Sequence, residues 1–378
     1  MPTLHSFPAT IAAILLGIAP VAQTQTFGSF TRPVPAPVIT PNKLSTFSDP
    51  ITHAPVRWEA LHTFNPAAIV RNGKIYVLYR AEDDSGTMEI GMHTSRLGLA
   101  TSSDGLTFTR LPEPVFFPSD DAQKTREWPG GVEDPRIVEA LDDSGQTGAY
   151  VLTYTQWNRS TYSIGIATSP DLQHWTKHGP AFLGSAGGRY DDLKYKSGGI
   201  VTQRLPTPTN PDRLVAAKIN GSFWMYWGEG AIHLATSPDL IHWTPAEDPH
   251  TQQPVEVLTK RPGHFDSGFP EVGPPPLLTA TGIVVLYNGK NDPAHGDPHL
   301  GANAYAAGQA SFAPDNPAHL LSRTEAPVLK PELAYEKTGQ YIAGTTFAEG
   351  LVHFRNRWFL FYGCADSAVG VVSTPAGP

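Results

Sequence analysis

Three acidic motifs stand out because each lies in a stretch rich in glycine and proline and poor in other charges. They are Gly130-Gly-Val-Glu-Asp-Pro-Arg136, Met225-Tyr-Trp-Gly-Glu-Gly230 and Asp266-Ser-Gly-Phe-Pro-Glu-Val-Gly-Pro274. Separated carboxyl groups around a pocket suit the cleavage of a glycosidic bond, in which one acid protonates the leaving oxygen and one base activates water. Taken singly, such residues more often cap turns or face solvent. The chemistry therefore depends on a fold that brings them together.

Aromatic residues surround one of these acids. Glu229 follows Phe223-Trp-Met-Tyr-Trp227, and we expect this apolar surface to desolvate its carboxylate. Aromatic rings also pack against the C–H faces of sugars, which makes four tryptophans candidates for substrate contact: Trp58, Trp128, Trp224 and Trp227. The alternative is that these rings belong to the hydrophobic core.

An internal repeat indicates which elements position the acids. The phrase Ala-Thr-Ser-Pro-Asp-Leu-x-His-Trp occurs at Ala167–Trp175 and Ala235–Trp243, and a degenerate copy begins at Ala100. Self-similarity at a fixed period is typical of folds built from repeated supersecondary units. Trp175 and Trp243 recur within the phrase, so we expect them to pack between strands.

A second marker extends the repeat to five units. Short strands that end in Tyr or Trp are predicted at 74–79, 149–154, 222–227, 283–287 and 357–362. They are rich in β-branched and aromatic residues and are bounded by Gly, Asn and Asp. Radial repetition of small antiparallel sheets is a β-propeller. We predict an all-β, five-bladed β-propeller; a two-sheet sandwich is the alternative, but it would not explain the period.

Composition excludes several classes of site. The 378 residues carry a net charge of −8 with no basic patch, which argues against nucleic-acid binding. No glycine-rich nucleotide motif or cysteine cluster is present, and Cys364 is expected to be a buried apolar residue. The run 292–299 has ligand-type residues, although a polar loop explains it better than a metal site. We expect neither a metal nor a cofactor.

The N-terminus is predicted to be a secretory signal peptide over 1–24, followed by a linker over 25–50 and the propeller over 51–378. The apolar run Ile11–Ala19 has the length of a signal-peptide core and is too short to span a bilayer comfortably. We therefore expect an exported protein without stable membrane insertion. A buried or disordered N-terminal segment is the alternative, since no Lys or Arg precedes the run. The sequence does not indicate an oligomeric state.

Several motifs, in this order, resemble glycoside hydrolase family 130. They are Phe64-Asn-Pro-Ala-Ala68, Tyr79-Arg-Ala81, Arg96-Leu-Gly-Leu-Ala100, Gly131-Val-Glu-Asp-Pro-Arg136, Lys196-Ser-Gly-Gly199 and the repeated Ser-Pro-Asp-Leu-x-His-Trp phrases. That family contains β-mannoside phosphorylases and β-1,2-mannosidases on a five-bladed propeller. The resemblance runs from about Trp58 to Val372.

The resemblance implies roles for individual residues. Asp134 matches the family's catalytic aspartate, a general acid that delivers its proton through the 3-hydroxyl of the mannose in the cleaved position. Asn65, Arg80 and Arg136 would form the wall of the same subsite. We further expect Lys196, Asp266 and Trp227 to contact the substrate.

The choice between hydrolysis and phosphorolysis depends on the residues that face the nucleophile. Where many phosphorylases of the family place a His-Arg pair, this chain has Trp227-Gly-Glu229, and Tyr287-Asn-Gly289 replaces their Tyr-His-Gly. Glu229 and Glu271 match the glutamate pair of the family's β-1,2-mannosidases. A carboxylate repels phosphate and suits water, so we predict an inverting, exo-acting β-1,2-mannosidase that acts on β-mannoside oligosaccharides.

Two alternatives remain open in the sequence. In a β-mannoside phosphorylase, Lys196, Lys218, Arg261 or His264 would supply cations for phosphate. In a non-catalytic sugar-binding propeller, the acids would only bond to hydroxyl groups.

Overall fold

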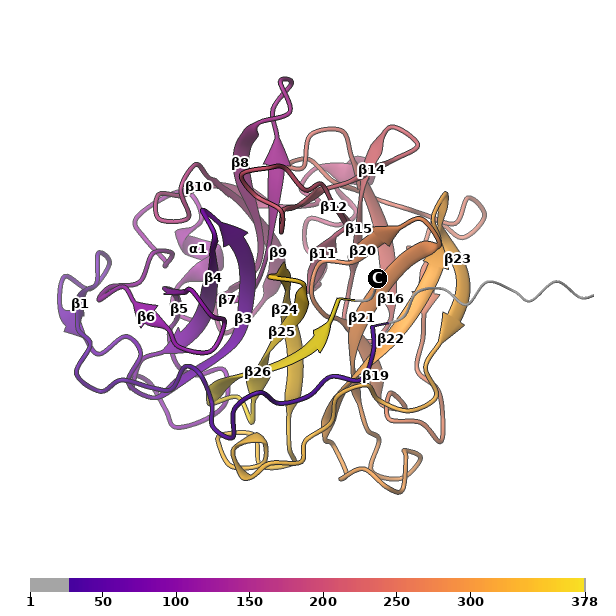
Figure 1. The fold of residues 1–378 in the computed structure, drawn as a ribbon. Helices are drawn as coiled ribbons and strands as arrows, with labels where there is room; N and C mark the ends of the chain where they lie inside the picture. The colour runs from indigo at the N-terminus through magenta and orange to yellow at the C-terminus, as the bar shows by residue number, and fades with distance from the viewer. Residues whose placement is uncertain (1–26, 377–378) are drawn as a thin grey trace, which may run out of the picture.

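The structure is a computed structural model that describes residues 27–376, and nearly all of its regular structure is β-strand (Figure 1). The predicted signal peptide lies outside the described residues. Among residues 27–376, no helix has the length and apolar character needed to cross a bilayer.

Five antiparallel units follow one another along the chain, and each begins at an inner strand and proceeds outward. The first contains β3 (His62–Arg71), β4 (Lys74–Glu82), β5 (Ser95–Ser102) and β6 (Thr109–Arg110). The second contains β7 (Gly131–Leu141), β8 (Thr147–Trp157), β9 (Tyr162–Ser169) and β10 (Thr176–Pro180). The third contains β11 (Gly198–Ile200), β14 (Lys218–Ile219), β15 (Ser222–Trp227), β16 (Ile232–Ser237), β17 (Thr244–Pro245) and β18 (Glu256–Leu258).

The fourth unit contains β19 (Phe269–Val272), β20 (Leu277–Thr279), β21 (Gly282–Lys290), β22 (Tyr305–Ala313) and β23 (Asn316–Arg323), and the fifth contains β24 (Thr346–Phe354), β25 (Arg357–Cys364) and β26 (Ala368–Pro375). The remaining elements are short: β1 (Phe47–Ser48), β2 (Pro55–Val56), α1 (Lys124–Glu127), β12 (Thr202–Arg204), β13 (Leu214–Ala216) and the 3₁₀ turns η1 (Ser185–Gly188) and η2 (Ala334–Glu336).

The five units close into a ring. The first strand of unit 1, β3, contacts both β7 of unit 2 and β24 of unit 5, and contacts between β7 and β11, β15 and β19, and β22 and β24 complete the circle. Apolar side chains of neighbouring units pack at these junctions, as Leu78 of β4 and Leu152 of β8 do. The ring is a five-bladed β-propeller, as predicted, and the sandwich alternative is excluded.

The repeat markers correspond to defined places in each unit. All five predicted strands fall on β4, β8, β15, β21 and β25, which follow the inner strand of their units. The repeated phrase ends one strand and turns the chain: Asp171 Oδ1 accepts the backbone N–H groups of Gln173 and His174, and Asp239 does the same in unit 3. The aspartate therefore caps the turn.

The predicted linker is bonded to the ring from residue 27 onward. Thr31 pairs with Ser373 and Ile39 with Val369, so the segment lies along the outer edge of β26, where Figure 1 shows the indigo chain beside the yellow strand. Arg32 forms ion pairs with Glu332 and Glu336. These contacts join the start of the described chain to its last unit and help to close the ring.

Candidate active site

A cavity of about 320 Å³ lies where inner strands and loops of several units meet, and six of the predicted site residues line it: Asn65, Arg80, Asp134, Lys196, Glu229 and Glu271. Its size suits one or two sugar rings. The carboxyl groups that are far apart in the sequence therefore do share one pocket.

Bulges in the inner strands aim side chains into this region. The pairing register shifts by one residue at Asn65 in β3, at Asp134 in β7 and at Glu349 in β24. Asn65 and Asp134 have φ angles of 43° and 47°, a left-handed conformation that Asn and Asp tolerate better than other non-glycine residues. Strained backbone of this kind concentrates at functional sites.

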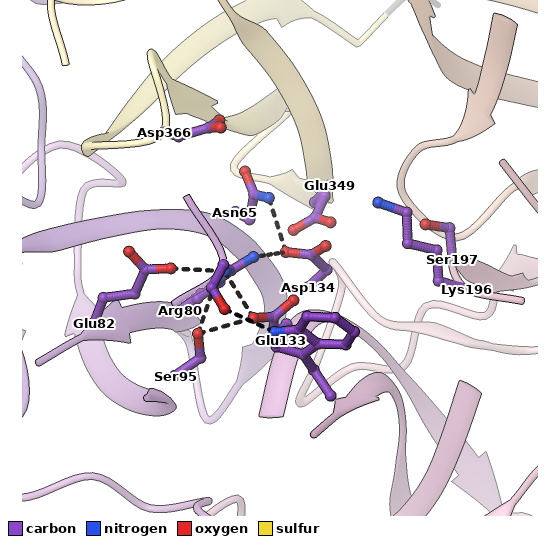
Figure 2. Close-up of polar contacts among 12 residues, drawn as sticks. Asn65, Arg80, Glu82, Ser95, Glu133, Asp134, Lys196, Ser197, Glu349 and Asp366 are labelled. Atoms are coloured by element: carbon purple, nitrogen blue, oxygen red, sulfur yellow. Dashed lines mark hydrogen bonds and ion pairs between the residues drawn. The ribbon is translucent and has the colours of Figure 1, made fainter. Parts of the chain in front are cut away.

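Asp134 is held by two donors on the first unit. Asn65 Nδ2 and Arg80 Nη1 donate hydrogen bonds to Asp134 Oδ1 at 2.8 and 3.1 Å. Arg80 also forms ion pairs with Glu82 at 2.6 Å and Glu133 at 2.8 Å. Figure 2 shows Arg80 at the centre of this network, with Ser95 bonded to both Arg80 and Glu133.

The neighbours Glu133 and Asp134 differ in charge. Burial raises the pKa of Glu133 to about 7, helped by the adjacent Asp134 and opposed by Arg80. Burial acts on Asp134 in the same direction, but Arg80, Lys196 and Arg136 outweigh it and lower the pKa of Asp134. Near neutral pH Asp134 is therefore ionised, whereas Glu133 is only partly ionised.

Glu229 and Glu271 form the opposite wall. An isolated antiparallel bridge joins their backbones, and Lys196 Nζ lies 3.3 Å from Glu229 Oε1 and 3.5 Å from Glu271 Oε1. Ser197 Oγ donates a hydrogen bond of 2.6 Å to Glu271 Oε1. Two carboxylates and one ammonium group thus converge on a small volume.

The Glu271 side chain is more deeply buried than that of Glu229. The Glu271 side chain is 1% exposed and that of Glu229 is 28% exposed, so the expected desolvation of Glu229 is wrong. Burial raises the pKa of Glu271 to about 7; Glu229 adds to the shift and Lys196 opposes it. Burial disfavours the charge on Lys196, but Glu271 and Glu229 raise its pKa well above the usual range.

Trp227 does not line the cavity. Its ring packs against Phe182 and His233 at centroid distances of 4.9 and 4.6 Å, and it is 5% exposed. Gly228 has φ 119°, and a Cβ atom there would lie 2.4 Å from the Ala231 carbonyl oxygen. The turn at this glycine separates the buried Trp227 from Glu229, which lines the cavity.

Asp266 and Arg136 also lie outside the cavity wall. Asp266 is fully buried, and its carboxylate pairs with Arg261 and Arg323 and accepts a hydrogen bond from Tyr287. Arg136 is 2% exposed and bonds to backbone carbonyl groups beneath the site. Both predictions of substrate contact are corrected: these side chains have protein partners and no place in the wall.

Sequence reasoning missed most of the aromatic and neutral lining. Trp157, Tyr162, Tyr305 and Tyr341 line the cavity, whereas Trp58, Trp128 and Trp224 do not. Thr155 Oγ1 and Thr345 Oγ1 are buried in this wall and have no partner among the described residues. Unpaired buried hydroxyls are costly without a ligand or water, so they are candidates to bond sugar hydroxyls. Their only sequence signal is a position at or beside an inner strand.

Of the four cation candidates for phosphate, Lys196 lines the cavity and the other three lie elsewhere. Arg261 and His264 contact Glu325, and Lys218 lies over the Phe223 ring. Within residues 27–376, no group of His, Cys, Asp and Glu side chains is arranged to hold a metal ion. Arg80 and Lys196 are thus the cationic side chains of the described cavity wall.

Comparisons with known proteins agree with this architecture. The family model of glycoside hydrolase family 130, described as β-1,4-mannooligosaccharide phosphorylase, matches residues 33–377. The chain is 30% identical to a 1,2-β-oligomannan phosphorylase from a Thermoanaerobacter species, over 83% of this chain and 90% of the relative.

Solved structures are more similar. A glycosyl hydrolase from Bacteroides ovatus is 48% identical with a TM-score of 0.87, covering 93% of this chain and 94% of that one. Another structure, 47% identical with a TM-score of 0.87 over 93% and 97% of the two chains, is described with the statement that the GH130 family of mannoside phosphorylases contains glycoside hydrolases that target β-1,2 mannosidic linkages in Candida mannan. The chain therefore belongs to glycoside hydrolase family 130.

Proposed function

We propose that this protein is an inverting, exo-acting β-mannoside hydrolase that releases mannose from β-1,2-linked mannosides. The observation that carries the proposal is the pair Glu229 and Glu271, which face one another in the cavity around Lys196. Two carboxylates at the nucleophile's place repel phosphate and can orient and deprotonate water. The 47% identical structure described with β-1,2-mannoside hydrolases supports the linkage.

Asp134 is the general acid of this proposal. Lys196 is among the groups that lower its pKa. A neutral sugar ring that fills the cavity excludes water from the Asp134 carboxyl group, and this further desolvation raises its pKa toward that of a proton donor. The neighbouring Glu133, with a pKa of about 7, is partly protonated near neutral pH. Inversion requires a carboxyl separation of roughly 6.5–9.5 Å, which leaves room for the water; this separation stays a prediction.

The alternative is a β-mannoside phosphorylase, favoured by the names of the curated relatives. Incubation of the purified protein with β-1,2-mannobiose, with and without inorganic phosphate, separates the two. Free mannose at equal rates in both buffers is expected. Mannose 1-phosphate formed only with phosphate would replace hydrolysis by phosphorolysis, and binding without any product would indicate a sugar-binding propeller.

Substitutions test the roles of the three acids. Asp134→Asn, Glu229→Gln and Glu271→Gln are each expected to lower kcat by about 10²-fold or more, the usual contribution of a general acid or base. Glu256→Gln is the matched control, since Glu256 is exposed on β18 and outside the cavity. NMR of the first product should show α-mannose, and β-mannose would contradict inversion.

Export belongs to the same proposal and is supported by the apolar run Ile11–Ala19. Expression of the full chain should yield a processed protein whose N-terminus follows residue 24, found outside the cytoplasm. An unprocessed cytoplasmic protein would contradict export and leave the catalytic proposal intact.

A further inference from the structure

Arg136 lies beneath the cavity and spans two strands that carry opposite halves of the site. It is on β7, two residues after Asp134, and its side chain is fully enclosed. Its Nη1 donates a hydrogen bond of 2.9 Å to the carbonyl oxygen of Asp134 itself. The other two guanidinium nitrogens bond to the fourth unit.

Those bonds reach the chain that carries Glu271. Arg136 Nη2 donates to the carbonyl oxygen of Val272 at 2.7 Å, and Nε donates to that of Gly273 at 3.1 Å. Val272 follows Glu271 directly. One rigid, planar group thus ties the backbone of the proposed acid to the backbone beside the proposed base.

Glu349 holds the guanidinium from the fifth unit. It occupies the bulge of β24, is 0% exposed, and lies 2.9 Å from Arg136 Nη1. This contact is an ion pair without hydrogen-bond geometry, and neither carboxyl oxygen has a hydrogen-bond partner among the described residues. Figure 2 shows Glu349 beside Asp134. Burial raises the pKa of Glu349 well above its usual range, and Arg136 is the first of the charges that oppose this shift.

We propose that Arg136, oriented by Glu349, is a positioning residue that sets the distance between the Asp134 carboxyl and the Glu271 carboxyl. This inference rests on the proposed roles of those two acids. Inverting cleavage needs a carboxyl separation that admits one water, and a displacement of about 1 Å can cost about 10²-fold in rate. Asp134 sits in a strained bulge, where the backbone needs an external support.

The geometry requires arginine in particular. Its fixed fork bonds three carbonyl groups at once, whereas a lysine ammonium keeps the charge but cannot span the same positions. Arg136→Lys therefore removes the support while it retains the positive charge beneath the site.

The experiment compares Arg136→Lys with Arg213→Lys in the hydrolysis of β-1,2-mannobiose. Arg213 is a matched control because it is buried and ion-paired with Glu139 on the same strand, β7, away from the cavity. Circular dichroism and melting curves establish that each variant is folded. We expect Arg136→Lys to lower kcat by about 10²-fold with KM within threefold of the wild-type value, and Arg213→Lys to change neither.

Other outcomes decide against the inference. A large rise in KM with kcat retained would make Arg136 a substrate-binding residue, and an unchanged kcat would show that the fork is not needed. If Arg136→Lys does not fold, Glu349→Gln decides: a kcat lowered at least fivefold at constant KM supports the inference, and wild-type kinetics overturns it. An inactive wild-type protein would instead refute the proposed function.

Discussion

Glu229 and Glu271 are held face to face by an antiparallel backbone bridge, with Lys196 within 3.5 Å of both carboxylates. The bridge joins the turn that follows β15 in unit 3 to β19 in unit 4, so the pair belongs to a junction between blades. The Glu271 side chain is buried and the Glu229 side chain is partly exposed. Water activation by such a pair depends on the ionised form of the buried member.

The pH dependence of catalysis should follow Glu271. Its pKa is raised to about 7, and a base must be deprotonated, so kcat/KM should fall as pH drops below about 7. Lys196 lowers this pKa, hence Lys196→Met should move the acidic limb to higher pH. Rate profiles between pH 4 and 9 measure the shift, with Lys194→Met, outside the cavity, as the control. An unmoved limb in Lys196→Met would contradict the assignment of Glu271 as the base.

The same residue should make stability depend on pH. The folded-state pKa of Glu271 lies above its unfolded value. The stability that its protonated carboxyl group contributes is therefore fully present below about pH 4.5 and is lost as pH rises to about 7. Between these pH values, the free energy of unfolding of the wild type should fall relative to that of Glu271→Gln by about 1.4 kcal/mol per pH unit. Urea unfolding at pH 5, 6 and 7 tests this. Parallel curves for the two proteins would refute it.

The loop between β4 and β5 should contribute to substrate affinity. Ile90 and Gly91 line the cavity, and Trp157 Nε1 donates a hydrogen bond of 2.9 Å to the Gly91 carbonyl oxygen, which fixes the loop. Ile90→Asp should raise KM for β-1,2-mannotriose about tenfold, the effect of roughly 1.4 kcal/mol of lost apolar contact. Met88 is exposed on the same loop but outside the cavity wall. Met88→Asp should therefore leave KM unchanged; equal effects of the two variants would argue for a general loop disturbance.

The N-terminal segment should contribute to stability through Arg32. Its guanidinium pairs with Glu336, which is 0% exposed. Arg32→Met leaves that carboxylate without its cation and should lower the free energy of unfolding by about 3 kcal/mol. Arg57→Met, which breaks an exposed pair with Asp84, should cost less than about 1 kcal/mol. Urea denaturation compares the two, and a similar small loss in both would show that the segment is dispensable for closure.

The loops that reach the cavity are harder to identify from the sequence than the strands. Ile90, Gly91, Gln340 and Tyr341 line the cavity, whereas the segments 118–128 and 291–303 do not. Strand periodicity is a local property, whereas the direction in which a loop folds depends on its neighbours. Asp366 illustrates the same limit, since it lies in a turn without a distinctive motif and still reaches the cavity wall.

The sequence by itself determined the five units, their order and the motifs that carry the acids, because strand alternation and capped turns are local and recur at a fixed period. The family resemblance also indicated Asn65 and Asp134, and both lie in left-handed bulges before a proline in the structure. The tertiary structure alone decided which side chains of each motif face the cavity. Asp134 and Arg136 are two residues apart on one strand, and yet the first lines the cavity while the second is buried and donates a hydrogen bond to the carbonyl oxygen of the first. That difference arises from ring closure, which brings Val272, Gly273 and Glu349 within reach of one guanidinium group.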